Sequence, residues 1–232
     1  LLGADYAVHC MPKPDWDLGW DMEGTQAALS SAAEEPGLDM LWAFGPLAVV
    51  AASRLHLQSM PVMTVSLWPK DKLITKVSKA AQRDGESIVA VYERGRLKRD
   101  LEHMQRLFET KRMCVMLPAG LLHAAPGVEA EIAALGRELQ LDLVVRSVSD
   151  PVSFVQDEDC ISPLYIAPGF DMSLEERKRL FQRLKEKRIF SFSAAGRLDV
   201  QAGALAGARP EVRIQMGRRM ALNTQELLVG KE

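Results

Sequence analysis

The residues of this chain that could recognise a small molecule stand in short turns directly after apolar runs. Glycine, proline and serine recur there, and helix-opening N–H groups in such turns suit a carboxylate or another anion. One such residue alone is ordinary turn chemistry, so the prediction depends on their recurrence at equivalent positions. The candidate ligand contacts are Gly45, Pro46, Ser66, Trp68, Ala119, Gly120, Phe170, Ser193 and Gly196.

Motifs of catalysis are missing from the sequence. There is no G-x-G-x-x-G after a strand, no G-x-x-x-x-G-K-[ST] and no G-x-S-x-G. Only His123 stands near a candidate turn, and an isolated histidine rarely acts without a partner. We therefore expect a protein that is not an enzyme and that carries no cofactor. The four histidines are His9, His56, His103 and His123.

Metal and disulfide patterns are equally weak. Asp15, Asp17 and Asp21 form an acidic cluster, but a calcium loop would need further ligands and a distal glutamate at the right spacing. We interpret the cluster as a solvated loop or part of a tryptophan lid, and expect no metal. Three widely spaced cysteines give no disulfide framework, and Cys114 and Cys160 lie in apolar runs typical of buried thiols.

The composition is that of a globular protein without an unusual charge. Of 232 residues, 47% are hydrophobic and 26% charged, with a net charge of -2. This balance of charges gives no overall positive electrostatic field that would attract nucleic acid. No apolar stretch reaches the roughly 18–20 residues that a bilayer span needs, so we expect no direct membrane insertion. No signal-peptide pattern opens the chain, and we expect one to have been removed or not included.

Short apolar runs alternate with longer amphipathic segments along the chain. This rhythm predicts parallel sheets covered by helices. Ser173 and Glu176 form a predicted capping box at one helix start, while segments 68–87 and 149–159 receive no assignment. The predicted strands are 38–44, 61–66, 87–92, 112–117, 141–148, 160–167 and 188–193. The predicted helices are 46–55, 97–108, 127–139, 174–184 and 215–228.

Several ordered segments resemble one known family. The run "DMLWAFGPLAVVAASRL" followed by "PVMTVSL" resembles the N-lobe of the uncharacterised ABC-transporter substrate-binding protein family. "RDLEHMQRLFETKRMCVML" continues the likeness into the other lobe. Near the end, "ISPLYIAPGFDMSLEERKRLFQRLKEKRIFSFSAAGRLDVQAGALAG" and "GRRMALNTQELLVGK" are similar to its closing segments. The resemblance spans most of residues 38–232.

The resemblance implies the type I periplasmic binding protein fold. Two Rossmann-like lobes, each a mostly parallel sheet flanked by helices, would be joined by a hinge and close over a ligand in an interlobe cleft. The N-terminal lobe would comprise residues 1–110 plus 204–232, and the C-terminal lobe residues 111–203. The nine candidate contacts, apart from Trp68, fall on the family's ligand-facing turns. Pro46 departs from the hydroxyl residue of many members, which leaves backbone groups as contacts there.

The function that the resemblance implies is capture of a small ligand for an ABC-type transporter. The partners would be an amino-acid-like ligand and a membrane permease, and the place would be the bacterial periplasm or another exported location. Two alternatives stay open. A sensor or assembly protein could keep the fold without a ligand, and a small-molecule enzyme could use a Rossmann-like scaffold.

Overall fold

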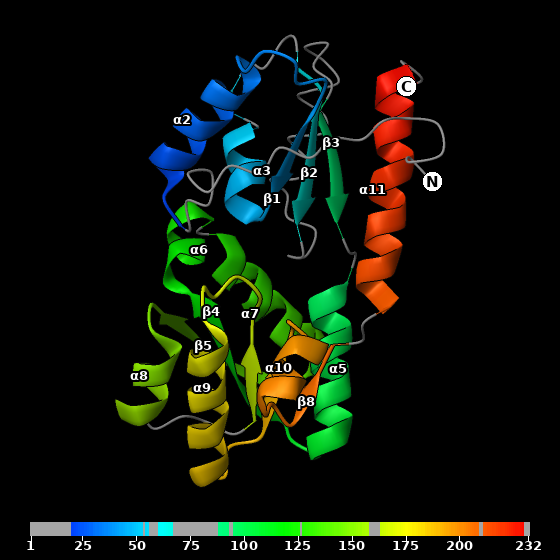
Figure 1. Cartoon of the computed structure of the whole chain (residues 1–232). Helices are drawn as coiled ribbons and strands as arrows, with labels where there is room; N and C mark the ends of the chain where they lie inside the picture. Colours follow the sequence, from blue (N-terminus) through cyan, green and yellow to red (C-terminus); the bar gives the residue numbers. More distant parts are fainter. Residues whose placement is uncertain are drawn as a thin grey trace. The chain divides into compact units, whose positions relative to one another are not determined.

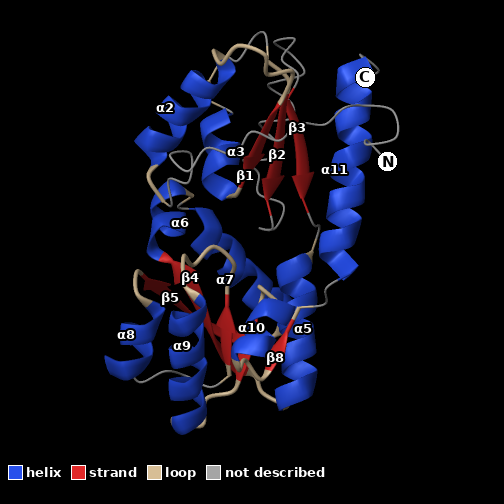
Figure 2. Ribbon diagram, in the orientation of Figure 1, coloured by secondary structure: helices blue, strands red, loops and turns tan. Residues whose placement is uncertain are grey.

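The computed structural model describes residues 20–52, 54–55, 60–66, 88–92, 95–125, 127–157, 163–208 and 211–229. The chain divides into two compact units. Unit 1 comprises Leu1–Arg94 and Glu211–Glu232, and unit 2 comprises Gly95–Pro210. Each unit contains a sheet and the helices that cover it (Figures 1 and 2). Every strand pairing among the described residues is parallel, which confirms the predicted α/β class.

Unit 1 is built on a sheet with the strand order β1-β2-β3. Its strands are β1 (Leu41–Phe44), β2 (Val62–Ser66) and β3 (Ile88–Tyr92), and its helices are α2 (Met22–Ala33), α3 (Pro46–Ala52) and α11 (Glu211–Val229). Leu41 and Val62 pack with alanines of α2 and α3. Met63, next to Val62 on β2, packs instead with Met216 and Met220 of α11. Since neighbouring strand residues point to opposite faces, α2 and α3 cover one face and α11 the other.

Unit 2 contains a sheet with the order β5-β4-β6-β7-β8. Its strands are β4 (Arg112–Pro118), β5 (Asp142–Val148), β6 (Leu164–Ile166), β7 (Ser191–Ser193) and β8 (Ala206–Gly207). Its helices are α5 (Arg96–Phe108), α6 (Ala119–Ala124), α7 (Gly127–Leu139), α8 (Pro151–Asp157), α9 (Leu174–Glu186) and α10 (Arg197–Ala202). This order places β4, β6 and β7 in the interior of the sheet.

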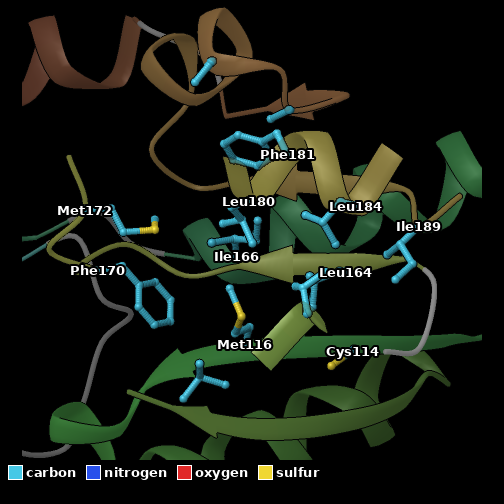
Figure 3. Close-up of a cluster of buried hydrophobic side chains, with 14 residues drawn as sticks. Cys114, Met116, Leu164, Ile166, Phe170, Met172, Leu180, Phe181, Leu184 and Ile189 are labelled. Carbon is cyan, nitrogen blue, oxygen red and sulfur yellow. The ribbon is translucent and has the colours of Figure 1, made fainter. Parts of the chain in front are cut away.

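Both faces of the unit 2 sheet are covered. Leu164 and Ile166 pack with Leu180 and other side chains of α9 (Figure 3). Tyr165, between them on β6, points to the other face, where its hydroxyl donates to Asp100 of α5 over 3.2 Å. Burial on both faces explains why β4 and β6 are nearly continuous apolar runs instead of alternating patterns.

The unit boundaries differ from the predicted lobe boundaries, which lay at residues 110/111 and 203/204. Helix α5 belongs to unit 2, because Arg96 at its start donates to the Ala194 carbonyl and Asp100 accepts from Tyr165. Residues 204–210 also belong to unit 2, because β8 extends the sheet beside β7. Long-range packing decides both assignments, and neither leaves a local signal in the sequence.

Candidate functional site

Gly45 forms the turn between β1 and α3 in unit 1. This residue follows β1 with φ +98, in the region that favours glycine, and a Cβ there would meet no heavy atom within 4 Å. Its N–H donates to the Val65 carbonyl over 2.8 Å. The backbone angle, and not close packing, is therefore what requires glycine. Pro46 opens α3 and Ser66 ends β2, at the same edge of the sheet.

For two predicted contacts of unit 1 the structure gives the backbone alone, and a third lies outside the described residues. The side chains of Pro46 and Ser66 are not described, and Trp68 lies outside the described residues. In unit 2, Ala119 and Gly120 are the first residues of α6, directly after β4, and both are half-buried. The sequence thus located the carboxyl ends of β1, β2 and β4 correctly, since these residues stand where the strands end.

Phe170 lies in the turn after β6, but its side chain packs in the hydrophobic core of unit 2. It is 9% exposed and belongs to the cluster that also contains Met172, Met116 and Ile166 (Figure 3). Burying an aromatic ring of this size stabilises the turn in one conformation. The ring therefore anchors the turn in the core.

Ser193 ends β7, and its hydroxyl is used within unit 2. The residue is fully buried. Its Oγ donates to Oδ2 of Asp199 over 2.5 Å and accepts the N–H of Ala195 over 3.0 Å. Asp199 is 1% exposed and also pairs with Arg177, whose Nη1 lies 2.6 Å from its Oδ1. The hydroxyl thus helps to hold the turn together.

Gly196 follows in the same turn, with φ +68. A Cβ at this position would lie 2.6 Å from the carbonyl oxygen of Ala208, beyond β8. Ala208 is itself fixed, because its N–H donates to the Ser193 carbonyl over 2.9 Å. Both the backbone angle and the close approach of a second chain segment require glycine here.

Sequence reasoning missed the charged side chains that hold the turns of unit 2. Arg177 stands three and four residues before Leu180 and Phe181, so helical periodicity places it on the buried stripe of α9. A cation on such a stripe indicates an internal partner, and that signal was available in the sequence. Asp199 lies in a helix of only six residues, which is too short to show a face.

The described titratable groups with shifted pKa values are helix caps and surface pairs. The Ser173 hydroxyl and N–H hold the pKa of Glu176 below its ordinary value. In the same way, Ser153 lowers the pKa of Asp150 at the start of α8. Both carboxylates accept hydrogen bonds in the first turn of a helix, where negative charge is favoured. These shifts belong to local helix structure and indicate no acid–base pair.

The cysteines and histidines of the sequence form no site with the turns in the part of the chain that the structure describes. Cys114 is buried, as predicted, while Cys10, Cys160, His9 and His56 lie outside the described residues. His103 and His123 are exposed. Within the described ranges, no group of three His, Cys, Asp or Glu side chains could hold a metal ion. Of the helices described, none has the length and apolar character that crossing a membrane demands.

Three solved structures resemble this one in fold. A conserved domain protein from Vibrio cholerae has a TM-score of 0.64 and 14% identity, covering 91% of this chain and 69% of its own. An ABC domain from Streptococcus pneumoniae in complex with L-Trp has a TM-score of 0.64 and 13% identity, covering 90% and 72%. A ligand-free, open substrate-binding protein with adhesive properties from Clostridium difficile has a TM-score of 0.50 and 16% identity, covering 91% and 71%.

These comparisons confirm the predicted periplasmic-binding-protein-like fold. One of the three is described as a substrate-binding protein, and another as a domain in complex with L-Trp. At 13–16% identity the likeness is one of fold. No protein-family model and no curated protein matches the sequence. Membership of the particular family that the sequence resembles therefore stays a prediction.

Proposed function

We propose that this chain is the solute-binding component of an ABC-type transport system and captures a small ligand of the amino acid class. The observation that carries the proposal is the fold, which matches over about nine-tenths of the chain a domain with L-Trp bound. Open parallel sheets bind ligands at the carboxyl ends of their strands. Gly45 and Gly120, two of the predicted contacts, follow the ends of β1 and β4, which supports the proposal.

Backbone groups are the main ligand contacts in this proposal. The Phe170 ring is packed in the core and the Ser193 hydroxyl is bonded to Asp199. The N–H of Gly45 and both main-chain groups of Ala194 already bond within their own units. Main-chain groups of Gly120 and its neighbours at the start of α6 would therefore recognise the carboxylate or ammonium of an amino acid. The interlobe cleft, the membrane permease and export from the cytoplasm belong to the same proposal as expectations.

A thermal-shift screen tests the proposal. The twenty L-amino acids, their D-enantiomers and small organic acids are added one at a time to the purified chain. A ligand at a hundredfold excess over its Kd stabilises the folded state by about 2.7 kcal/mol. We expect a rise in Tm with at least one amino acid and none with matched salts. A flat response across the panel would contradict ligand capture.

The second candidate is a ligand-free assembly or sensor role on the same fold. Two of the predicted contact side chains favour this role, because they are already used inside unit 2: the Phe170 ring packs in the core, and the Ser193 hydroxyl is hydrogen-bonded to Asp199 and Ala195. The same screen distinguishes the candidates. A flat thermal response, together with retention of a protein partner on an affinity column, would support the assembly role.

A further inference from the structure

The side chain of Arg177 contacts the turn that follows β6. Arg177 lies in α9, and its side chain is 14% exposed. Its Nε donates to the Met172 carbonyl over 3.1 Å, and its Nη2 donates to the Phe170 carbonyl over 3.3 Å. One guanidinium therefore fixes two carbonyls of a turn that has no regular secondary structure of its own.

The third nitrogen of the same guanidinium, Nη1, connects Arg177 to the turn that follows β7. Nη1 of Arg177 donates to Oδ1 of Asp199 over 2.6 Å. The other carboxylate oxygen of Asp199 accepts from the Ser193 hydroxyl over 2.5 Å. Ser193 Oγ in turn accepts the N–H of Ala195 over 3.0 Å. An unbroken chain of hydrogen bonds thus joins two turns about 20 residues apart in sequence.

The turn after β7 is also held from the opposite side. Arg96, buried at the start of α5, donates from Nη2 to the Ala194 carbonyl. The N–H of Ala194 donates to the Ile166 carbonyl on the neighbouring strand over 3.0 Å. The position of this turn is therefore determined by three elements together, which makes Asp199 and Arg177 the link between it and the turn after β6.

The buried charges make this link energetically strong. Hydrogen bonds to charged groups are stronger than neutral ones, and removing one partner leaves the other charge buried without compensation. Asp199 is 1% exposed, so it cannot exchange Arg177 for water without opening the turn. Opening either turn therefore weakens the contacts of the other.

We propose that Arg177 is a positioning residue that, through Asp199, couples the two strand-end turns of unit 2 and sets their geometry for ligand binding. Arg177 does this without contacting the ligand. The ligand part of this statement rests on the proposed function above. The coupling itself is a property of unit 2 and is measurable on the ligand-free chain.

Hydrogen exchange followed by mass spectrometry tests the coupling. The variants are R177M, R177K and the matched control K178M. Lys178 is the next residue on the same helix, and its ammonium forms an exposed pair with Glu175. For R177M we expect exchange to be about tenfold or more faster in both 167–173 and 193–199, since bonds to charged groups contribute at least that much. Exchange in β4 should stay unchanged.

The lysine variant separates the two ends of the link. Lysine carries one ammonium group in place of the planar guanidinium. This ammonium can pair with Asp199, but it cannot also donate to the carbonyls of both Phe170 and Met172. R177K should therefore keep 193–199 near wild-type exchange while 167–173 exchanges faster. This result is also available if R177M fails to fold. Faster exchange in only one turn of R177M, equal acceleration everywhere, or an effect of K178M of the same size would overturn the coupling.

Calorimetric titration with L-tryptophan and with each amino acid that shifts Tm tests the ligand part. We expect R177M to weaken affinity about tenfold or more, and K178M to stay within about twofold of wild type, as the contact energies indicate. Unchanged affinity in R177M despite faster exchange would overturn the positioning role. If the wild-type chain binds none of these ligands, the proposed function and the ligand part fail, and the exchange data still decide the coupling.

Discussion

Gly196 provides the sharpest test of how close packing shapes unit 2. Its φ of 68 and ψ of -129 lie in a region that side-chain-bearing residues rarely adopt. A Cβ would also lie 2.6 Å from the Ala208 carbonyl oxygen, which is backbone and cannot rotate away. Alanine at this position therefore combines backbone strain with a steric clash.

Gly95 is the matched control, because it isolates the backbone angle. It lies in the same unit with a φ of 66, but its ψ of 20 is ordinary left-handed helix. A Cβ there would meet no heavy atom within 4 Å. Gly95→Ala should lower the free energy of unfolding by about 1–2 kcal/mol, the usual penalty of that conformation. Gly196→Ala adds a clash of about 1–3 kcal/mol and a rarer backbone region, for about 3–5 kcal/mol in total.

Urea unfolding measured by far-UV circular dichroism compares the two variants. With a urea m-value of about 2 kcal/mol/M, a difference of about 2 kcal/mol moves the midpoint of unit 2 by about 1 M. Tryptophan fluorescence reports unit 1 separately, because all tryptophans belong to its sequence: Trp16, Trp20, Trp42 and Trp68. If Gly196→Ala falls within about 0.5 kcal/mol of Gly95→Ala, the close approach of Ala208 is not a determinant of stability.

Two further substitutions test local helix structure. Gly217→Ala, in the exposed part of α11 where a Cβ would meet no heavy atom within 4 Å, should raise the free energy of unfolding by about 0.5–1 kcal/mol, and a fall in the fluorescence midpoint would contradict this. Ser173→Ala removes the capping box of α9 and should lower it by about 0.5–2 kcal/mol at pH 7. Because Ser173 holds the pKa of Glu176 below its ordinary value, the part of this contribution that depends on the Glu176 carboxylate is present above the unfolded-state pKa and is lost as the pH falls through the folded-state pKa. The gap between wild type and Ser173→Ala should therefore narrow in acid, and a constant gap across urea titrations from pH 7 to pH 3 would contradict the assignment.

The regular elements were predictable because their signals are local. The predicted strand 61–66 is β2 (Val62–Ser66), and the predicted helix 127–139 is α7. The capping box is also present, with the Ser173 N–H donating to Glu176 over 2.8 Å. The short elements α6, α8, α10 and β8 were missed, because their two to seven residues show no clear apolar period. Helix α2 was missed as well, since its small and polar residues leave only Thr25 and Ala32 buried.

The sequence by itself determined the α/β class, the order of the larger elements and the places where strands end in turns. Those properties follow from the periodicity of apolar residues and from glycine and proline, which act within a few residues of chain. Only the tertiary structure decided that Phe170 packs inward, that Ser193 bonds to Asp199 and that Arg177 joins two turns. These outcomes depend on which distant segments meet at the edge of a sheet. Burial of a polar group requires a partner, and the partner's place is a property of the whole fold.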